Sequence, residues 1–186
     1  MTRLTVKELA LDGLKLVERR RLGDPRGFLA RMFCNEELSA AGWNDPVAQI
    51  NHTHTARCGT VRGMHFQYPP HAEMKLVSCI RGEVWDVAID LRAGSQTFLR
   101  WHAERLSGEN GRAMLIPEGF AHGFQALSDD AELIYCHSAP YSAAHEAGLN
   151  PGDPKLAIAW PLQIADLSPR DAAHSMLSES FAGVAL

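Results

Sequence analysis

The sequence predicts a mainly β fold, a sandwich or barrel of antiparallel strands. In most segments apolar and polar residues alternate over about five to eight positions, which is typical of strands with one buried face. Glycine, proline, asparagine or aspartate separates these segments, and the runs recur roughly every ten to fifteen residues between positions 45 and 140. A chain of 186 residues with 46% hydrophobic residues fills one such core, so we expect a single domain over residues 1–186.

The first segment, MTRLTVKELALDGLKLVERR, is interrupted by charged residues every few positions. We therefore expect neither a signal peptide nor a membrane span, and a cytoplasmic protein. The formal net charge of -4 argues against a nucleic-acid or anionic-membrane binder, because such proteins carry a basic surface. We interpret the one basic run, Arg19 to Arg21, as a solvated strand end.

Further along, CNEELSAAG has the pattern of a short helix, and VWDVAID, AMLIPEGFAHGF and AELIYC are the clearest strand segments. After residue 140, repeated prolines prevent long regular elements, although a short helix is expected after Ser168. The four cysteines show no CxxC spacing, so neither a zinc site nor a disulfide framework is indicated. Cys79 and Cys136 lie in apolar runs, as expected for buried thiols.

The stretch GTVRGMHFQYPPHAEMKLVSCIRG carries an unusual set of polar side chains between two strand-like runs. Gly59 is followed after five residues by His65 and then by Gln67, and Lys75 is followed after six residues by Gly82. This spacing resembles the first sequence motif of the cupin superfamily, small jelly-roll barrels also described as double-stranded β-helices.

A second motif follows between Gly111 and His122, with Pro117 and Gly119 at the cupin spacing. In metal-binding cupins the two motifs supply three histidines and a glutamate, whereas here Gln67 and Lys75 stand at two of those positions. A protonated ammonium is not a ligand and repels a divalent cation, so we predict no metal at this site.

The pair His52-x-His54 lies on one face of a predicted strand. Two imidazoles on one face can bind a metal, but no third ligand is evident. We favour an exposed or substrate-facing position for this pair.

A histidine and a fixed cation in one barrel suit a reaction that generates an oxyanion. Removing a proton next to a ketone produces an enolate, and a positioned lysine offers that oxygen both charge and a hydrogen bond. Histidine has an ordinary pKa near 6.5, which suits proton abstraction at neutral pH when an acceptor fixes its tautomer.

Several segments in order, QINHTHTARCGTVRGMHFQYPP, KLVSCIRGEVWDVAIDLRAGSQTF, IPEGFAHGF, YCHSAPYSAAHE, DPKLAIAWP and SPRD, resemble the dTDP-4-dehydrorhamnose 3,5-epimerase family. The resemblance runs from about Asp24 to Asp171. It implies a jelly-roll cupin barrel with short peripheral helices, no cofactor and no metal. It also implies a homodimer in which an N-terminal arm, about residues 1–45, packs on the partner, and an irregular segment over about residues 140–186.

By this resemblance His65 is the base that removes protons from C3 and C5 of a 4-keto sugar, and Asp171 orients it. Lys75 stabilises the enolate oxygen, and Tyr135 returns the proton on the other face. Two alternatives stay open: Tyr141 in place of Tyr135 as the acid, and Asp171 as the cap of the short helix.

The resemblance also implies a set of substrate contacts, with Arg26 and Phe28 near the nucleotide. The full set is Arg26, Phe28, Gln49, Asn51, Arg62, Gln67, His122, Tyr141, Glu146 and Arg170.

The chain departs from the family pattern near its start. Where that pattern resembles D-x-R-G-F-F-x-E, this chain reads DPRGFLAR, with Leu29 and Arg31 at the differing positions. An arginine cannot accept a hydrogen bond from the thymine ring N–H. The nucleotide is therefore open among dTDP, CDP, UDP and GDP, and so is the choice of C3, C5 or both.

Three other functions stay open. A sugar-nucleotide 3,4-ketoisomerase would also use histidine in a cupin, but the combination of Lys75, Tyr135 and SPRD argues against it. A metal-dependent cupin dioxygenase or isomerase would hold a stoichiometric transition metal. A non-catalytic sugar-binding or storage cupin needs no matched base and acid.

Overall fold

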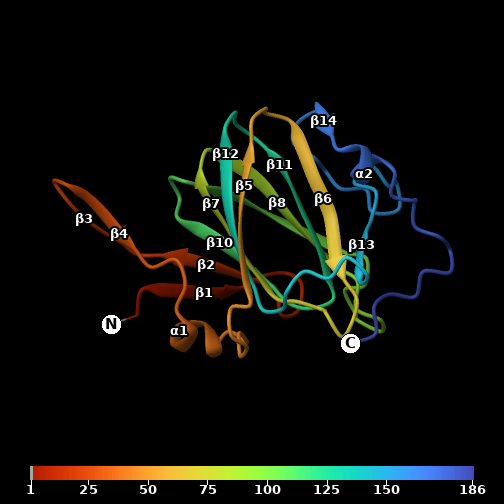
Figure 1. Cartoon of the computed structure of the whole chain (residues 1–186), viewed down its shortest axis with the longest axis horizontal. Helices are drawn as coiled ribbons and strands as arrows, with labels where there is room; N and C mark the ends of the chain where they lie inside the picture. The colour runs from red at the N-terminus through yellow and green to blue at the C-terminus, as the bar shows by residue number, and fades with distance from the viewer. Residues whose placement is uncertain (1) are drawn as a thin grey trace.

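A computed structural model describes residues 2–186, most of which form or connect strands of two facing sheets (Figure 1). The elements in chain order are β1 (Leu4–Glu8), β2 (Lys15–Arg19), β3 (Arg21–Asp24), β4 (Gly27–Ala30), α1 (Asn35–Ser39), β5 (Gln49–Thr55), β6 (Thr60–Gln67), β7 (Lys75–Arg81), β8 (Glu83–Asp90), β9 (Trp101–Ser107), β10 (Arg112–Ile116), β11 (Phe120–Ala126), β12 (Ala131–His137), β13 (Glu146–Gly148), β14 (Asp166–Leu167) and α2 (Pro169–Ala172).

The first sheet has the strand order β1-β2-β10-β7-β12-β5, and the second has the order β13-β6-β11-β8-β9. Within both sheets these strands pair antiparallel, and β14 adds to β6 in parallel. The predicted mainly β, jelly-roll barrel with short peripheral helices is confirmed. The three clearest strand segments correspond to β8, to β10 and β11 joined by a turn, and to β12.

The apolar residues form three clusters that explain the layering. One lies between the sheets and includes Phe124 and Leu133. The second packs the C-terminal segment, for example Leu177, on the outer face of the second sheet. The third packs the region around Trp43 on the outer face of the first sheet. Because both faces of the second sheet are covered, all seven residues of β11 are buried, where alternation predicted one solvated face.

The N-terminal residues divide into two parts. β1 pairs with β2, and β2 pairs with β10, so these strands extend the first sheet of their own chain. The hairpin β3–β4 instead projects away from the body (Figure 1). It presents the half-exposed or exposed apolar residues Leu22, Phe28 and Leu29.

The interpretation of Arg19 to Arg21 as a solvated strand end is wrong for Arg19. Its guanidinium is half-buried and donates to the Ser78 hydroxyl at 2.7 Å. Burial lowers the pKa of Arg19 to about 10. Arg20 is exposed as expected.

The predicted buried thiols are confirmed, since Cys79 and Cys136 are both buried and free. The two predicted short helices are present as α1 and α2. Within residues 2–186, no helix has the length and apolar character needed to span a membrane.

Candidate active site

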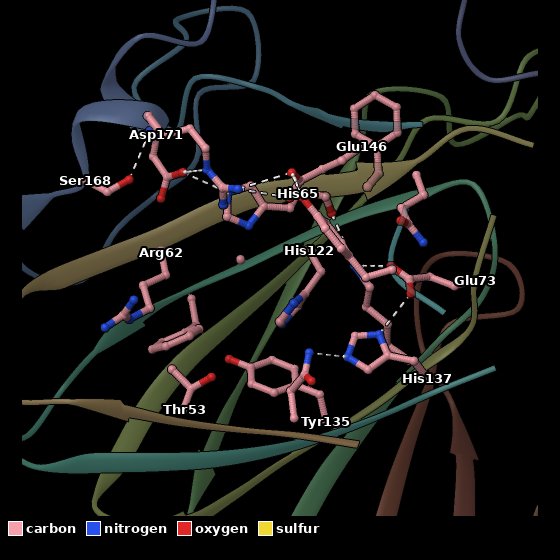
Figure 2. A pocket seen from close by; sticks show the side chains of 18 of the residues that line it. Thr53, Arg62, His65, Glu73, His122, Tyr135, His137, Glu146, Ser168 and Asp171 are labelled. Atoms are coloured by element: carbon pink, nitrogen blue, oxygen red, sulfur yellow. Dashed lines mark hydrogen bonds and ion pairs between the residues drawn. The ribbon is translucent and has the colours of Figure 1, made fainter. Parts of the chain in front are cut away.

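A cavity of about 670 Å³ opens between the two sheets (Figure 2). Strands of both sheets, the loop after β12 and helix α2 contribute to it. Eleven of the predicted site residues line it, namely Asn51, Arg62, His65, Gln67, Lys75, His122, Tyr135, Tyr141, Glu146, Arg170 and Asp171.

Two glycines bring the central strands of the second sheet together at this cavity. A Cβ on Gly63 would lie 2.6 Å from the Cα of Gly123, so neither position tolerates a side chain without displacing the other strand. Gly63 also has φ +114, which favours glycine. Beside this close approach His65 on β6 and His122 on β11 are directly paired in register.

His65 forms a short hydrogen bond with Asp171. His65 Nε2 lies 2.7 Å from the Oδ1 atom of Asp171, although the two residues are 106 positions apart. An ionised carboxylate only accepts hydrogen bonds, so Nε2 carries the proton and Nδ1 keeps a lone pair. This tautomer leaves Nδ1 as the basic nitrogen.

Helix α2 holds Asp171 in place. The hydroxyl of Ser168 caps the helix by accepting from the backbone N–H of Asp171 at 3.0 Å. The Asp171 carboxylate is therefore not the cap, and its second oxygen accepts from the Gly63 N–H at 3.2 Å. Burial alone would raise the pKa of Asp171, but the donors from His65, Gly63 and Ser168 together lower it.

The pKa of His65 is lowered from its ordinary value. Burial is the main cause, and the charges of Arg170 and Lys75 act in the same direction. The hydrogen bond and charge of Asp171 oppose this shift without reversing it. His65 is therefore a neutral base at pH 7.

Arg170 links this base to the rim of the cavity. Its Nη1 lies 3.1 and 3.2 Å from the two carboxylate oxygens of Glu146. Its Nη2 lies 3.0 Å from His65 Nε2, but both nitrogens are donors in this tautomer, so the contact places a positive charge beside the imidazole without a hydrogen bond. Glu146 also accepts from the Tyr141 hydroxyl at 2.9 Å.

A second histidine and aspartate pair lies across from the first. His122 Nε2 is 2.8 Å from the Oδ1 atom of Asp86, and both side chains are almost fully buried. Asp86 Oδ2 has no hydrogen-bond partner among residues 2–186. Burial raises the pKa of Asp86, although His122 opposes the shift.

The two candidate acids occupy different environments. Tyr135 is buried on β12, and its ring centroid lies 5.8 Å from that of His122. Burial raises the pKa of Tyr135 well above its ordinary value, so it keeps its proton. Tyr141 is 54% exposed at the rim.

Lys75 is buried at the start of β7, and its ammonium lies 3.1 Å from Glu73 Oε1. Glu73 Oε2 in turn accepts from His137 Nδ1 at 2.9 Å (Figure 2). Burial would raise the pKa of Glu73, but the hydrogen bond from His137 and the charge of Lys75 lower it overall.

Among the predicted substrate contacts, Arg62 lines the cavity and donates to the Thr55 hydroxyl and the His54 carbonyl. Gln67 lines the cavity too, and its substrate contact stays a prediction. Its amide donates to the carbonyls of His71 and Pro140 and accepts from the Ser142 N–H at 2.6 Å. Its polar atoms therefore hold loops at the rim.

Three predicted residues lie outside this cavity of their own chain. Arg26 and Phe28 are exposed on the projecting hairpin, where Arg26 pairs with Asp24. Gln49 supports the rim, because its amide donates to Asn51 Oδ1 at 3.0 Å and accepts from the Tyr141 N–H.

His52 and His54 are exposed and pair with Glu132 and Asp130, so they do not face the cavity. One trio of possible metal ligands occurs in residues 2–186, His65, Asp171 and His174, whose ligand atoms lie within 4.8 Å of one another. The Arg170 guanidinium touches His65 Nε2 there and would repel a cation. Absence of a metal stays a prediction.

The sequence reasoning missed Glu73, His137 and Asp86. Asp86 lies across from Phe124 on β11 and so is offset by two residues from His122, a relation that only the sheet register shows. Glu73 precedes Lys75 by two residues, and His137 follows Tyr135 by two. Alternate positions on extended chain share a face, so this signal was available.

The site combines a neutral histidine held by a carboxylate, a buried ammonium and a protonated phenol around one enclosed space. Such groups can remove a proton, stabilise the resulting oxyanion and return a proton from another direction. The fold and the cavity define an enzyme of the cupin class with acid–base groups inside its barrel.

Comparisons with known proteins identify the particular family. A family model described as dTDP-4-dehydrorhamnose 3,5-epimerase matches residues 8–179. A protein of that name from Pseudomonas aeruginosa is 46% identical over 161 residues, 86% of this chain and 87% of its own. A dTDP-4-dehydrorhamnose 3-epimerase from Streptomyces niveus is 40% identical and covers 95% of this chain and 86% of its own.

Among solved structures, a dTDP-4-dehydrorhamnose 3,5-epimerase from Bacillus anthracis with TDP and pyrophosphate bound is similar with a TM-score of 0.90 and 38% identity. The match covers 94% of this chain and 99% of that one. The chain belongs to the dTDP-4-dehydrorhamnose 3,5-epimerase family.

Proposed function

We propose that this enzyme epimerises a nucleoside-diphosphate-linked 4-keto-6-deoxyhexose, converting dTDP-4-dehydro-6-deoxyglucose to dTDP-4-dehydrorhamnose. One observation carries the proposal. The His65–Asp171 pair, the buried Lys75 and the protonated Tyr135 share one cavity. Membership of the epimerase family supports the same reaction class.

In this mechanism Nδ1 of His65 removes the proton next to the ketone. The electron pair of the broken C–H bond forms a C=C bond, and the π pair of the carbonyl moves to its oxygen, giving an enolate stabilised by the Lys75 ammonium. Tyr135 then donates its proton to the carbon from the opposite face, and proton exchange with water restores both groups. Asp171 stabilises the imidazolium while His65 holds the proton.

The remaining cavity residues are proposed substrate contacts. Arg62 and Arg170 offer the cations that a diphosphate requires, because guanidinium groups bind phosphate oxygens in bidentate fashion. The other contacts offer hydrogen-bonding groups to the sugar, namely Asn51, His122, Tyr141 and Glu146.

A homodimer is part of the proposal. The β3–β4 hairpin leaves the body with Phe28 61% and Leu29 62% exposed, and exposed apolar residues of this kind mark interaction surfaces. We propose that Arg26 and Phe28 reach the nucleotide in the partner's cavity. Light scattering of the purified protein tests the dimer, and a monomer with full activity would contradict it. The cytoplasmic location also stays a prediction, to be tested by cell fractionation.

Thymine is the proposed base of the nucleotide, and the relative solved with TDP supports it. Arg31, which departs from the family pattern, forms an ion pair with Glu37 of its own chain. Its side chain is therefore occupied, and thymine selection falls to other groups.

Incubation with the nucleotide sugar in deuterated water tests the function. Deuterium should enter C3, C5 or both, and a panel of dTDP, CDP, UDP and GDP sugars reads the nucleotide preference. Tyr135→Phe should retain exchange while losing inversion, whereas Tyr141→Phe should retain both. Absence of exchange with every member of the panel would overturn the proposal.

A further inference from the structure

Lys75 stands at one end of a chain of polar side chains that crosses the first sheet. From the buried ammonium toward the rim, the chain runs through Glu73, His137 and Asn51 to Gln49. The side chains of Lys75, Glu73 and His137 are 9%, 8% and 11% exposed. Three ionisable groups this deeply buried need a common explanation.

The hydrogen bonds along this chain have one consistent direction. Asn51 Oδ1 accepts from the Gln49 amide at 3.0 Å, which turns the Asn51 amide group toward His137 Nε2 at 3.4 Å. His137 Nε2 is then an acceptor, and Nδ1 donates to Glu73. Glu73 thus receives a hydrogen bond from His137 on one oxygen and faces the Lys75 ammonium with the other.

The Lys75 ammonium has three donors. One faces Glu73 Oε1 at 3.1 Å, and another faces the backbone carbonyl of His65 at 3.4 Å. These are its two polar partners within the described residues 2–186, so the third donor is free for a ligand in the cavity. The carbonyl belongs to the same residue that supplies the proposed base.

We propose that Glu73 is a positioning residue, which keeps the Lys75 ammonium charged and aims its free donor at the oxyanion formed in the cavity. This rests on the proposed function, because it assigns the cation that faces the enolate. Glu73 acts through Lys75 and does not touch the sugar. His137 holds Glu73 in turn, with its tautomer set by Asn51.

A counter-ion is required because a buried ammonium without one loses its proton readily. Glu73 is its nearest carboxylate. The charge of Lys75 also acts on His65 and Asp86. The remaining titratable or charged groups that line the same cavity are Arg62, His122, Tyr135, His137, Tyr141, Glu146, Arg170 and Asp171. The Asp86 carboxylate is already hydrogen-bonded to His122, so Glu73 supplies the negative charge that pairs with the Lys75 ammonium.

The first test is the pH dependence of kcat and KM in Glu73→Gln, an uncharged variant of the same shape. Kcat should fall about 10- to 100-fold with KM changed less than about 3-fold, because an oxyanion contact is made in the transition state. The basic limb of the pH profile should move down by about one unit or more, because the Lys75 ammonium has lost its counter-ion. Glu104→Gln is the matched control, since Glu104 pairs with His102 on β9 outside the cavity, and its basic limb should stay in place.

The second test separates action through Lys75 from direct contact. Glu73→Gln should cause no further loss of exchange in a Lys75→Met background. An equal loss in both backgrounds would overturn the proposal, as would an unmoved basic limb. Glu73→Asp keeps the charge and should restore the limb, which distinguishes a loss of charge from a loss of folding.

A third test needs no substrate, and so stands even if the proposed function fails. The chain has four lysines, Lys7, Lys15, Lys75 and Lys155, so carbon-13 signals of labelled lysine can be resolved and assigned with Lys75→Met. In Glu73→Gln the Lys75 signal should titrate at lower pH by about one unit or more. An unchanged titration in a folded variant would refute the inference even if the wild type epimerises its substrate.

Discussion

Two histidine and aspartate pairs lie at the same cavity, with their histidines on neighbouring strands, and they differ in how the carboxylate is held. The pair distances are 2.7 Å for His65 and Asp171 and 2.8 Å for His122 and Asp86. The second oxygen of Asp171 accepts from the Gly63 N–H, whereas that of Asp86 has no partner in residues 2–186.

As a consequence, the pKa values of the two aspartates shift in opposite directions. Hydrogen bonds lower the pKa of Asp171, while burial raises that of Asp86. The His65 side chain is also 25% exposed to the cavity, against 6% for His122. The two pairs thus differ both in the donors around the carboxylate and in the access of the imidazole to the cavity, and both differences favour His65 as the base.

The largest expected effect comes from removing the base. His65→Ala should reduce deuterium exchange about 10⁴-fold, at the upper end of general-base contributions. His122→Ala should reduce it about 10-fold, through weaker sugar binding. Mass spectrometry of the product measures both, and equal losses would remove the distinction between the pairs.

Removing the charge of each aspartate in turn should again slow exchange more in the His65 pair than in the His122 pair, with a smaller difference between the two. Asp171→Asn should slow exchange about 10²- to 10³-fold, because His65 loses the acceptor that fixes its tautomer. Asp86→Asn should slow it less than about 10-fold, since an amide oxygen can still accept from His122. Single-turnover rates at pH 7 provide the measurement, and a larger loss in Asp86→Asn would reverse the assignment.

The pH dependence of kcat/KM tests the protonation state of His65 in the first pair. His65 acts in its neutral form and its pKa is lowered, so the acidic limb of kcat/KM should lie below pH 6.5. Arg170→Gln removes a positive charge that lowers this pKa, so the limb should move to higher pH. Arg20→Gln, at an exposed position, serves as the control. A shift of the acidic limb to lower pH in Arg170→Gln would contradict the inference that the charge of Arg170 lowers the pKa of His65.

Stability should show the smallest effect. The lowered pKa of Asp171 means that its stabilisation is present above about pH 4 and is lost as pH falls through the folded-state pKa. Asp171→Asn should lower the free energy of unfolding by about 1 to 3 kcal/mol at pH 7. The raised pKa of Asp86 works against folding at neutral pH, so Asp86→Asn should change stability by less than about 1 kcal/mol. Urea unfolding of both variants at pH 7 and pH 4 tests the contrast.

Much of the fold could be predicted because its signals are local. Alternation and turn residues indicated β8, β10, β11 and β12, and proline density indicated the strand-poor segment after residue 140. Alternation failed on β11, because a segment distant in sequence covers its outer face. It also failed to indicate that Arg19 is half-buried.

Within the site, His65, Lys75 and His122 could be identified from the chain alone, because their spacing forms two motifs. The sequence also carried a family resemblance that pointed to Asp171 and Tyr135. The spacing of residues within a motif is visible in a single sequence, so these positions could be identified without the structure.

The partner of each of these residues became apparent only in the folded chain. Asp171 reaches His65 across 106 positions through the cap of α2, and Glu73 meets His137 across 64. The unpaired oxygen of Asp86 likewise depends on how β8 and β11 align in the barrel. Hydrogen bonds of this kind depend on sheet register and on the close approach of Gly63 to Gly123, which strand periodicity does not specify.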